Sequence, residues 1–267
     1  LRHTVRASAD PAADAATPAT LTAAEAESLR AGIEHSVAGL IAGAAPPAAI
    51  IEGAEKIGFD ITHVYGLTET YGPAAVCAKH DDWNALDIGE RARLNARQGV
   101  RYHLQRDVRV LDPQTMQPVP QDGETMGEIM FRGNLVMKGY LKNEKATNEA
   151  FAGGWFHTGD LARMDEEGFY YITGRKKNLI ILASGENVSP EELEGMLEKC
   201  HAVQECIVKE LGKKIRVVVY CEKQHQQTVR DFIAQMNRTV PLYKRIGVVE
   251  FSETPLPRNG AGKLVRK

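Results

Sequence analysis

Residues 40–69 alternate between apolar runs and turn residues in an order that strongly limits the fold of the chain. Residues 40–42 form an apolar run, residues 43–47 follow as a Gly/Pro turn, and a helical stretch leads to a second apolar run at 61–64. This order predicts a strand–helix–strand unit in an open α/β sheet. Ligands of such open sheets bind beyond the carboxyl ends of the strands. We therefore expect the turn at 43–46 and residues 65–69 to face one crevice.

The pattern changes twice further along the chain. Between about residues 100 and 173, short apolar runs alternate with turn signals such as Pro120-Gln121-Asp122-Gly123, which is typical of short strands in a β-rich region. After Arg175, strand and helix patterns alternate, with a helix start at Ser189-Pro190. We expect an α/β and α+β protein: residues 1–174 form part of a large domain with a β-rich subdomain at about 100–174, and residues 175–267 form a small mobile domain. A capping box at Thr22 and Glu25 also predicts a helix over 22–37.

Composition excludes several classes of protein. Lys and Arg number 33 against 35 Asp and Glu, so no basic excess indicates nucleic acid. The longest apolar run, at about 180–183, is far shorter than the roughly 20 residues of a transmembrane helix. The four cysteines have no paired spacing that would bind zinc, which favours buried, reduced thiols. We expect a cytoplasmic protein, with an organellar signal left open because a truncated start could have lost one.

Four motifs lie in one order between residues 64 and 263. They are Val64-Tyr65-Gly66-Leu67-Thr68-Glu69, His157-Thr158-Gly159-Asp160, Gly174-Arg175-Lys176-Lys177 and Pro257-Arg258-Asn259-Gly260-Ala261-Gly262-Lys263. Together they supply an aromatic plate, a hydroxyl, two carboxylates and several cations, the groups that a nucleotide ester needs. The order resembles the adenylate-forming superfamily of acyl-CoA synthetases, luciferases and peptide-synthetase adenylation domains. The resemblance covers about residues 36–267. Residues 36–160 are most similar to the medium-chain and aromatic acyl-CoA ligases, whereas the tail departs from that pattern by a short loop between Val208 and Val217.

The resemblance implies a nucleotide site. Tyr65 would lie against adenine, Asp160 would accept hydrogen bonds from both ribose hydroxyls, and Arg175 would donate to ribose or phosphate. The full set of positions implied to bind the nucleotide is Gly43, Ala44, Ala45, Val64, Tyr65, Gly66, Thr68, Asp160, Arg175 and Lys263. His157, beside Trp155 and Phe156, is interpreted as a packed loop histidine and not as a base.

The resemblance also implies catalytic groups. Thr68 would bond a phosphate oxygen, Glu69 would hold Mg²⁺, and Lys263 would bridge the attacking carboxylate and the α-phosphate. Lys177 matches the hinge about which the small domain turns between the two half-reactions. The acyl pocket would lie near Leu67, Tyr71 and Gly72.

We therefore expect an AMP-forming acyl-CoA synthetase that uses ATP, Mg²⁺ and CoA to activate a medium-chain, fatty or aromatic carboxylic acid. A domain that loads a carrier-protein thiol, and an incomplete nucleotide-binding fragment, stay open as alternatives. The family's glycine-rich phosphate loop does not occur in this sequence, and the first residue is Leu1. The chain therefore resembles the C-terminal half of such an enzyme, and we expect it alone not to form an acyl-adenylate. The oligomeric state is left open.

Overall fold

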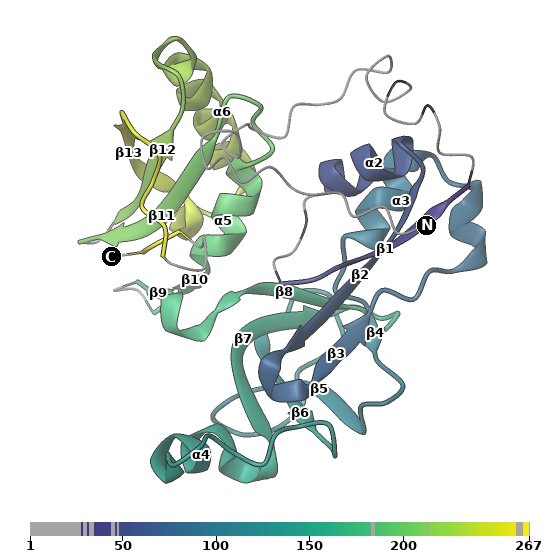
Figure 1. Ribbon diagram of the computed structural model, residues 1–267. Coiled ribbons are helices and arrows are strands. Elements are labelled where there is room, and N and C mark those ends of the chain that lie inside the picture. Colours follow the sequence, from purple (N-terminus) through teal and green to yellow (C-terminus); the bar gives the residue numbers. More distant parts are fainter. Residues whose placement is uncertain are drawn as a thin grey trace.

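The computed structural model describes residues 28, 31, 35–43, 46, 48–182, 185–212, 214–259 and 264–266. Strands β1 to β8 with helices α2 to α4 form one part of the molecule, and strands β9 to β13 with helices α5 and α6 form another (Figure 1). The helix predicted over 22–37 falls mostly outside the described residues. Its last residue, Val37, begins a strand instead.

The first sheet contains the strand–helix–strand unit. Its order is β1 (Val37–Ile41), β2 (Phe59–Leu67), β3 (Gly72–Val76) and β4 (Val100–Arg101), with β1 parallel to β2 and the other pairs antiparallel. Helix α2 (Ala48–Lys56) connects β1 to β2, and α3 (Ile88–Asn95) lies beside it over a small core of Ile51, Ile61 and Ala92. The predicted order of elements is confirmed, but β2 extends three residues further than predicted and includes Tyr65.

The second sheet is antiparallel throughout, and it lies where the short strand patterns predicted a β-rich subdomain. Its order is β5 (Asp107–Leu111), β6 (Gly127–Arg132), β7 (Phe156–Met164) and β8 (Tyr170–Arg175), and α4 (Glu144–Ala150) precedes β7. Its core continues into the first sheet, because Phe131 and Phe156 share one cluster with Ala74 and Ala75 of β3. His157 lies in β7 and not in a loop, so that part of the interpretation was wrong.

The C-terminal part is a separate layer of strands and helices. Strands β11 (Glu205–Leu211), β12 (Lys214–Tyr220) and β13 (Ile246–Ser252) form a sheet in which β11–β12 is antiparallel and β12–β13 parallel. Helices α5 (Pro190–Leu197) and α6 (Gln226–Thr239) share its buried core, and β9 (Ile180–Ile181) pairs with β10 (Asn187–Val188). The mixed α/β and α+β fold class is confirmed.

The start of α5 carries a contact between the two parts. Ser189 stands at the N-cap position, as predicted, but its hydroxyl makes no capping bond. Instead it donates to the Thr173 carbonyl of β8, and it also bonds Glu191 Oε2 at 3.1 Å. Gly174 is packed so closely here that a Cβ would lie 2.3 Å from Ser189 Oγ. The end of β8 is therefore tied to the first turn of α5.

Gly99 is the tightest glycine in the junction between the two sheets. Its φ is +92°, its carbonyl accepts from Tyr170 N at 2.8 Å, and a Cβ would lie 2.0 Å from the Val76 carbonyl carbon. We expect Gly99→Ala to destabilise the fold by roughly 2–4 kcal/mol, because the backbone is strained and the neighbouring strand must move. Urea unfolding measures this loss. The matched control, Gly195→Ala on the exposed side of α5, should gain about 0.5–1 kcal/mol. Equal behaviour of the two variants would contradict the packing argument.

Candidate functional site

Three of the predicted site residues come together from three strands. Tyr65 of β2 donates its hydroxyl to Asp160 Oδ2 at 2.6 Å. Arg175 Nε lies 2.6 Å from Asp160 Oδ1, and the two residues are register partners across β7 and β8. Asp160 is 4% exposed, whereas the Arg175 side chain is 41% exposed. The carboxylate is thus fixed from two sides while the guanidinium still reaches solvent.

A local irregularity in β7 sets the direction of the Asp160 side chain. The β6–β7 register shifts between Glu128 and Met130, opposite the segment that holds Thr158 and Gly159. The Thr158 hydroxyl donates to the Ile129 carbonyl at 2.6 Å and accepts from the Asp160 amide at 2.9 Å. Bulges of this kind often turn a side chain toward a site. Sequence reasoning missed the role of Thr158, although a Thr-Gly pair inside a strand pattern is a signal for a bulge.

The Tyr65 hydroxyl is a hydrogen-bond donor to Asp160. Burial raises the pKa of Tyr65 well above its ordinary value, and the negative charge of Asp160 raises it further. The phenol is therefore protonated at physiological pH, as its hydrogen bond to Asp160 requires. Its ring packs against the core of the second sheet and is tilted against Phe131, with 6.1 Å between the ring centroids.

Thr68 and Glu69 follow the end of β2 in the short 3₁₀ turn Thr68–Thr70. The buried Thr70 holds this turn, because its hydroxyl contacts Leu67 N at 3.0 Å, Leu67 O at 2.9 Å and Gly72 O at 3.0 Å. Gly66 permits the close return of the chain, since a Cβ there would lie 2.2 Å from Gly72 O. Thr68 is exposed and Glu69 half-buried. Both side chains thus lie at the carboxyl end of β2, where the α/β rule places ligands.

Glu69 has two contacts from the segment after β6. Its carbonyl accepts from Met137 N at 2.8 Å, and its Oε1 accepts from the Tyr140 hydroxyl at 3.1 Å. No group of three or more His, Cys, Asp or Glu that could hold a metal occurs in the part of the chain that the structure describes. A single carboxylate still fits Mg²⁺, which proteins usually bind through one or two carboxylates together with substrate phosphates. Sequence reasoning missed Tyr140 as a partner of Glu69.

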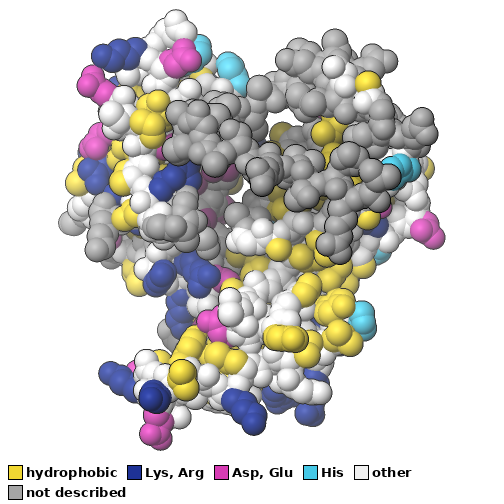
Figure 2. Space-filling model, in the orientation of Figure 1, with side chains coloured by type: hydrophobic (Ala, Val, Ile, Leu, Met, Phe, Trp, Pro, Cys, Tyr) yellow, Lys and Arg dark blue, Asp and Glu magenta, His cyan; other side chains and the backbone are white. Residues whose placement is uncertain are grey.

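The remaining predicted residues are placed in part. Gly43 (φ +90°) follows β1, whose Ile41 pairs with His63, so it lies at the same sheet edge as Tyr65. Ala44, Ala45 and Lys263 lie outside the described residues. Lys177 is exposed in the turn Lys176–Asn178 that follows β8. Figure 2 shows several groups of Lys and Arg side chains on the visible face, one of them in the middle of its left side.

The residues assigned to an acyl pocket differ in their surroundings. Leu67 packs against the core of the second sheet. The neighbouring Val64, which was assigned to the nucleotide, is buried inside β2. Tyr71 is 87% exposed with φ 55°, and Gly72 has φ 139°. Only Leu67 thus contacts a packed surface, while Tyr71 projects into solvent beside the Thr68–Thr70 turn.

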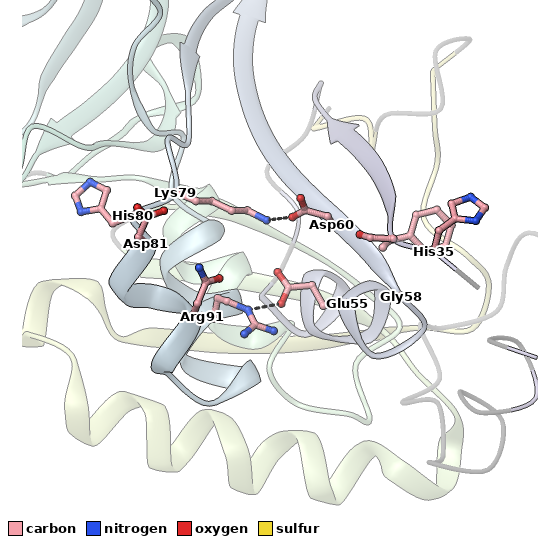
Figure 3. A pocket seen from close by; sticks show the side chains of 11 residues that line it. His35, Glu55, Gly58, Asp60, Lys79, His80, Asp81 and Arg91 are labelled. Carbon is pink, nitrogen blue, oxygen red and sulfur yellow. Dashed lines mark hydrogen bonds and ion pairs between the residues drawn. The ribbon is translucent and has the colours of Figure 1, made fainter. Parts of the chain in front are cut away.

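An open hollow of about 580 Å³ lies at the other end of the parallel strands (Figure 3). Its walls include His35 and Gly58 before β1 and β2, and it is crossed by the ion pairs Lys79–Asp60 and Arg91–Glu55, the latter 2.9 Å long. Because it lies at the amino ends of these strands, it is separate from the candidate site around Tyr65 and Glu69.

Two further findings bear on the class of protein. Among the described residues, no helix is long and apolar enough to cross a membrane. All four cysteines are free and buried, as the sequence indicated.

The comparisons identify the family. The sequence profile described as AMP-binding enzyme matches residues 4–141. An acetate–CoA ligase of Humulus lupulus is 43% identical over 242 residues, covering 87% of this chain and 42% of the relative. A peroxisomal acetate/butyrate–CoA ligase of Arabidopsis thaliana is 49% identical over 176 residues, covering 66% of this chain and 31% of the relative.

Solved structures agree with the sequence relatives. The o-succinylbenzoate CoA synthetase of Bacillus subtilis, in complex with its acyl-adenylate intermediate, has a TM-score of 0.71 at 26% identity, covering 91% of this chain and 48% of that one. The same enzyme is also known in complex with ATP and magnesium. The chain belongs to the AMP-binding enzyme family, within the adenylate-forming superfamily that its motifs resemble. It spans less than half the length of these relatives.

Proposed function

We propose that this chain is part of an AMP-forming acyl-CoA ligase. In this reaction a carboxylate attacks the α-phosphate of ATP, releasing pyrophosphate, and CoA then attacks the acyl-adenylate, releasing AMP. Residues 1–174 belong to the large nucleotide-binding domain and residues 175–267 to the small domain, with Lys177 as the hinge. Because the chain spans less than half the length of its relatives, this activity is proposed for the complete enzyme.

The convergence of Tyr65, Asp160 and Arg175 is the observation that carries this proposal. Asp160 and Arg175 lie 95 and 110 positions after Tyr65 in the sequence. Asp160 nevertheless accepts a hydrogen bond from Tyr65, and Arg175 pairs with the same carboxylate. A buried carboxylate can accept from a ribose diol, a half-exposed guanidinium can donate to ribose or phosphate, and an aromatic ring can contact adenine. Glu69 and Thr68, one turn from the end of the same strand, supply Mg²⁺ and phosphate ligands. Bound Mg²⁺ would neutralise phosphate charge during the transfer.

The substrate is proposed to be a monocarboxylic acid of small to medium size. The sequence resemblance favours a medium-chain, fatty or aromatic acid, whereas the names of the two curated relatives give acetate and butyrate. We therefore extend the proposal to short-chain acids. One of these relatives is named peroxisomal, so the proposed location includes an organelle as well as the cytoplasm.

A product analysis tests this function. The complete enzyme is incubated with Mg·ATP, CoA and acetate, butyrate, octanoate or benzoate in separate reactions. We expect acid-dependent formation of AMP, pyrophosphate and an acyl-CoA in equal amounts. Formation of ADP and phosphate would contradict the proposal. AMP and pyrophosphate without any acyl-CoA would mean that water hydrolyses the acyl-adenylate and that CoA is not the acceptor.

A further inference from the structure

Glu128 is a buried carboxylate directly behind the candidate site, and none of the roles above uses it. It lies in β6 and is 1% exposed. Its Oε1 accepts from the Gly159 amide at 2.9 Å. Its Oε2 lies 3.2 Å from His157 Nδ1 and 3.2 Å from Lys176 Nζ. Glu128 therefore touches the residue before Asp160 and the residue after Arg175.

The backbone explains why a carboxylate is needed here. The regular β6–β7 ladder is interrupted between Glu128 and Met130, so the Gly159 amide bonds a side chain in place of a strand carbonyl. Gly159 has φ +72°, which turns the chain into Asp160. A buried amide without a partner would be costly, so Glu128 stabilises the bulge that directs Asp160 toward Tyr65.

The charge of Glu128 has a second consequence. Burial alone would raise the pKa of Glu128, but the hydrogen bonds from Gly159 and His157, together with the Lys176 charge, hold this pKa below its ordinary value. Glu128 is thus ionised at physiological pH and pairs with Lys176, whose side chain is 50% exposed. The pair joins β6 to the turn that follows β8, immediately before Lys177.

We propose that Glu128 is a positioning residue for the nucleotide: it fixes Asp160 through Gly159 and Arg175 through Lys176, so that both face the ligand together. The inference rests on the proposed function, because it assigns Asp160 and Arg175 to the nucleotide. Although Glu128 does not contact the nucleotide, substitutions of Glu128 should weaken nucleotide binding. The affinity for the carboxylic acid should be unaffected.

Calorimetric titration of the complete enzyme with AMP tests the proposal. Glu128→Ala removes every contact and should lower AMP affinity by roughly 10- to 100-fold, as for lost hydrogen bonds to a charged group. Glu128→Gln should show a smaller loss, because its amide oxygen still accepts from Gly159. Lys176→Gln isolates the second contact and should lower the affinity by less than about tenfold. Glu149→Gln, an exposed glutamate of α4, is the matched control and should bind AMP as the wild type does.

Kinetics separate positioning from a general loss of stability. In the Glu128 variants we expect the KM for ATP to rise while the KM for the acid stays within about twofold, measured at a temperature where each variant is folded. A lowered Tm with unchanged AMP affinity and unchanged KM for ATP would overturn the proposal. If Glu128→Ala does not fold, the Glu128→Gln and Lys176→Gln titrations still decide. Wild-type enzyme that binds AMP but forms no acyl-adenylate would instead overturn the proposed function, leaving the AMP result for Glu128 to stand.

Discussion

Lys263→Ala is expected to abolish acyl-adenylate formation in the complete enzyme and to leave thioester formation from a synthetic acyl-adenylate largely intact. The proposed role of Lys263 is to bridge the carboxylate and the α-phosphate and to offset charge that grows in the transition state. Loss of one such electrostatic contact typically lowers kcat by about 100- to 1000-fold. The second half-reaction contains no attack on phosphorus, so it does not need this charge.

Both half-reactions are measured separately, by pyrophosphate exchange and by consumption of synthetic acyl-adenylate with CoA. Lys145→Ala, on the exposed side of α4, serves as the control and should leave both unchanged. An equal loss of both half-reactions in Lys263→Ala would contradict the assignment.

The segments on either side of residues 260–263 are held to the C-terminal sheet and helix. Before them, Glu205 accepts from Leu256 N at 2.6 Å and pairs with Arg258 at 2.6 Å. After them, the two terminal nitrogens of Arg266 lie 2.6 and 2.5 Å from the two carboxylate oxygens of Glu194, which is 8% exposed. A bidentate pair of this kind is geometrically specific. The chain therefore enters and leaves the Lys263 segment at fixed points.

Asp160→Ala should weaken the binding of ATP and of AMP to the same extent, because both nucleotides contain the ribose diol. We expect a loss of about 1.5–3 kcal/mol, the usual range for hydrogen bonds to a charged group. Among the effects on nucleotide binding and catalysis, this is the second largest we predict. Calorimetric titration with each nucleotide measures it, and unchanged AMP affinity would rule out Asp160 as the ribose ligand.

Two further variants control for the contacts that Asp160 makes in the free protein. Removing its carboxylate leaves the Tyr65 hydroxyl and Arg175 Nε without their 2.6 Å partners, so part of the loss is reorganisation. Tyr65→Phe removes the same hydrogen bond but retains the ring and the carboxylate, and should cost less than Asp160→Ala. Asp160→Asn keeps the shape and should fall between them. A Tyr65→Phe loss as large as that of Asp160→Ala would show that the hydrogen bond, and not the carboxylate, matters.

The sequence predicted the fold class and the order of most elements, because turn residues and apolar periodicity are local signals. It misplaced the ends of β2 and put His157 in a loop, whereas His157 lies in β7. Tyr65, Gly66 and Leu67 are paired with β3, and this pairing depends on Gly66 and Thr70 closing a turn that no local pattern reveals. Residues 156–164 have glycine and charged residues that suggest a loop, yet their pairing with β6 and β8 makes them a strand.

Only the residues of the candidate site that lie in sequence motifs could be predicted from the sequence. Tyr65, Asp160 and Arg175 lie in recognisable motifs, and their meeting is visible in the structure. The other site residues contact partners that are distant in sequence. Thr158 bonds Ile129, and Tyr140 bonds Glu69. Glu128 bonds Gly159 and Lys176. Such contacts follow from strand register, which is a tertiary property that a single sequence does not reveal.

Isotope transfer is the most direct test of carboxylate activation through an adenylate. The complete enzyme is supplied with Mg·ATP, CoA and a carboxylic acid labelled with ¹⁸O in both carboxylate oxygens, and the products are examined by mass spectrometry. One carboxylate oxygen becomes the bridge to the α-phosphorus, and attack of CoA at the carbonyl carbon then leaves that oxygen on the phosphate. We predict one ¹⁸O in each AMP formed and none in pyrophosphate. Unlabelled AMP, or label in phosphate or pyrophosphate, would contradict the adenylate mechanism.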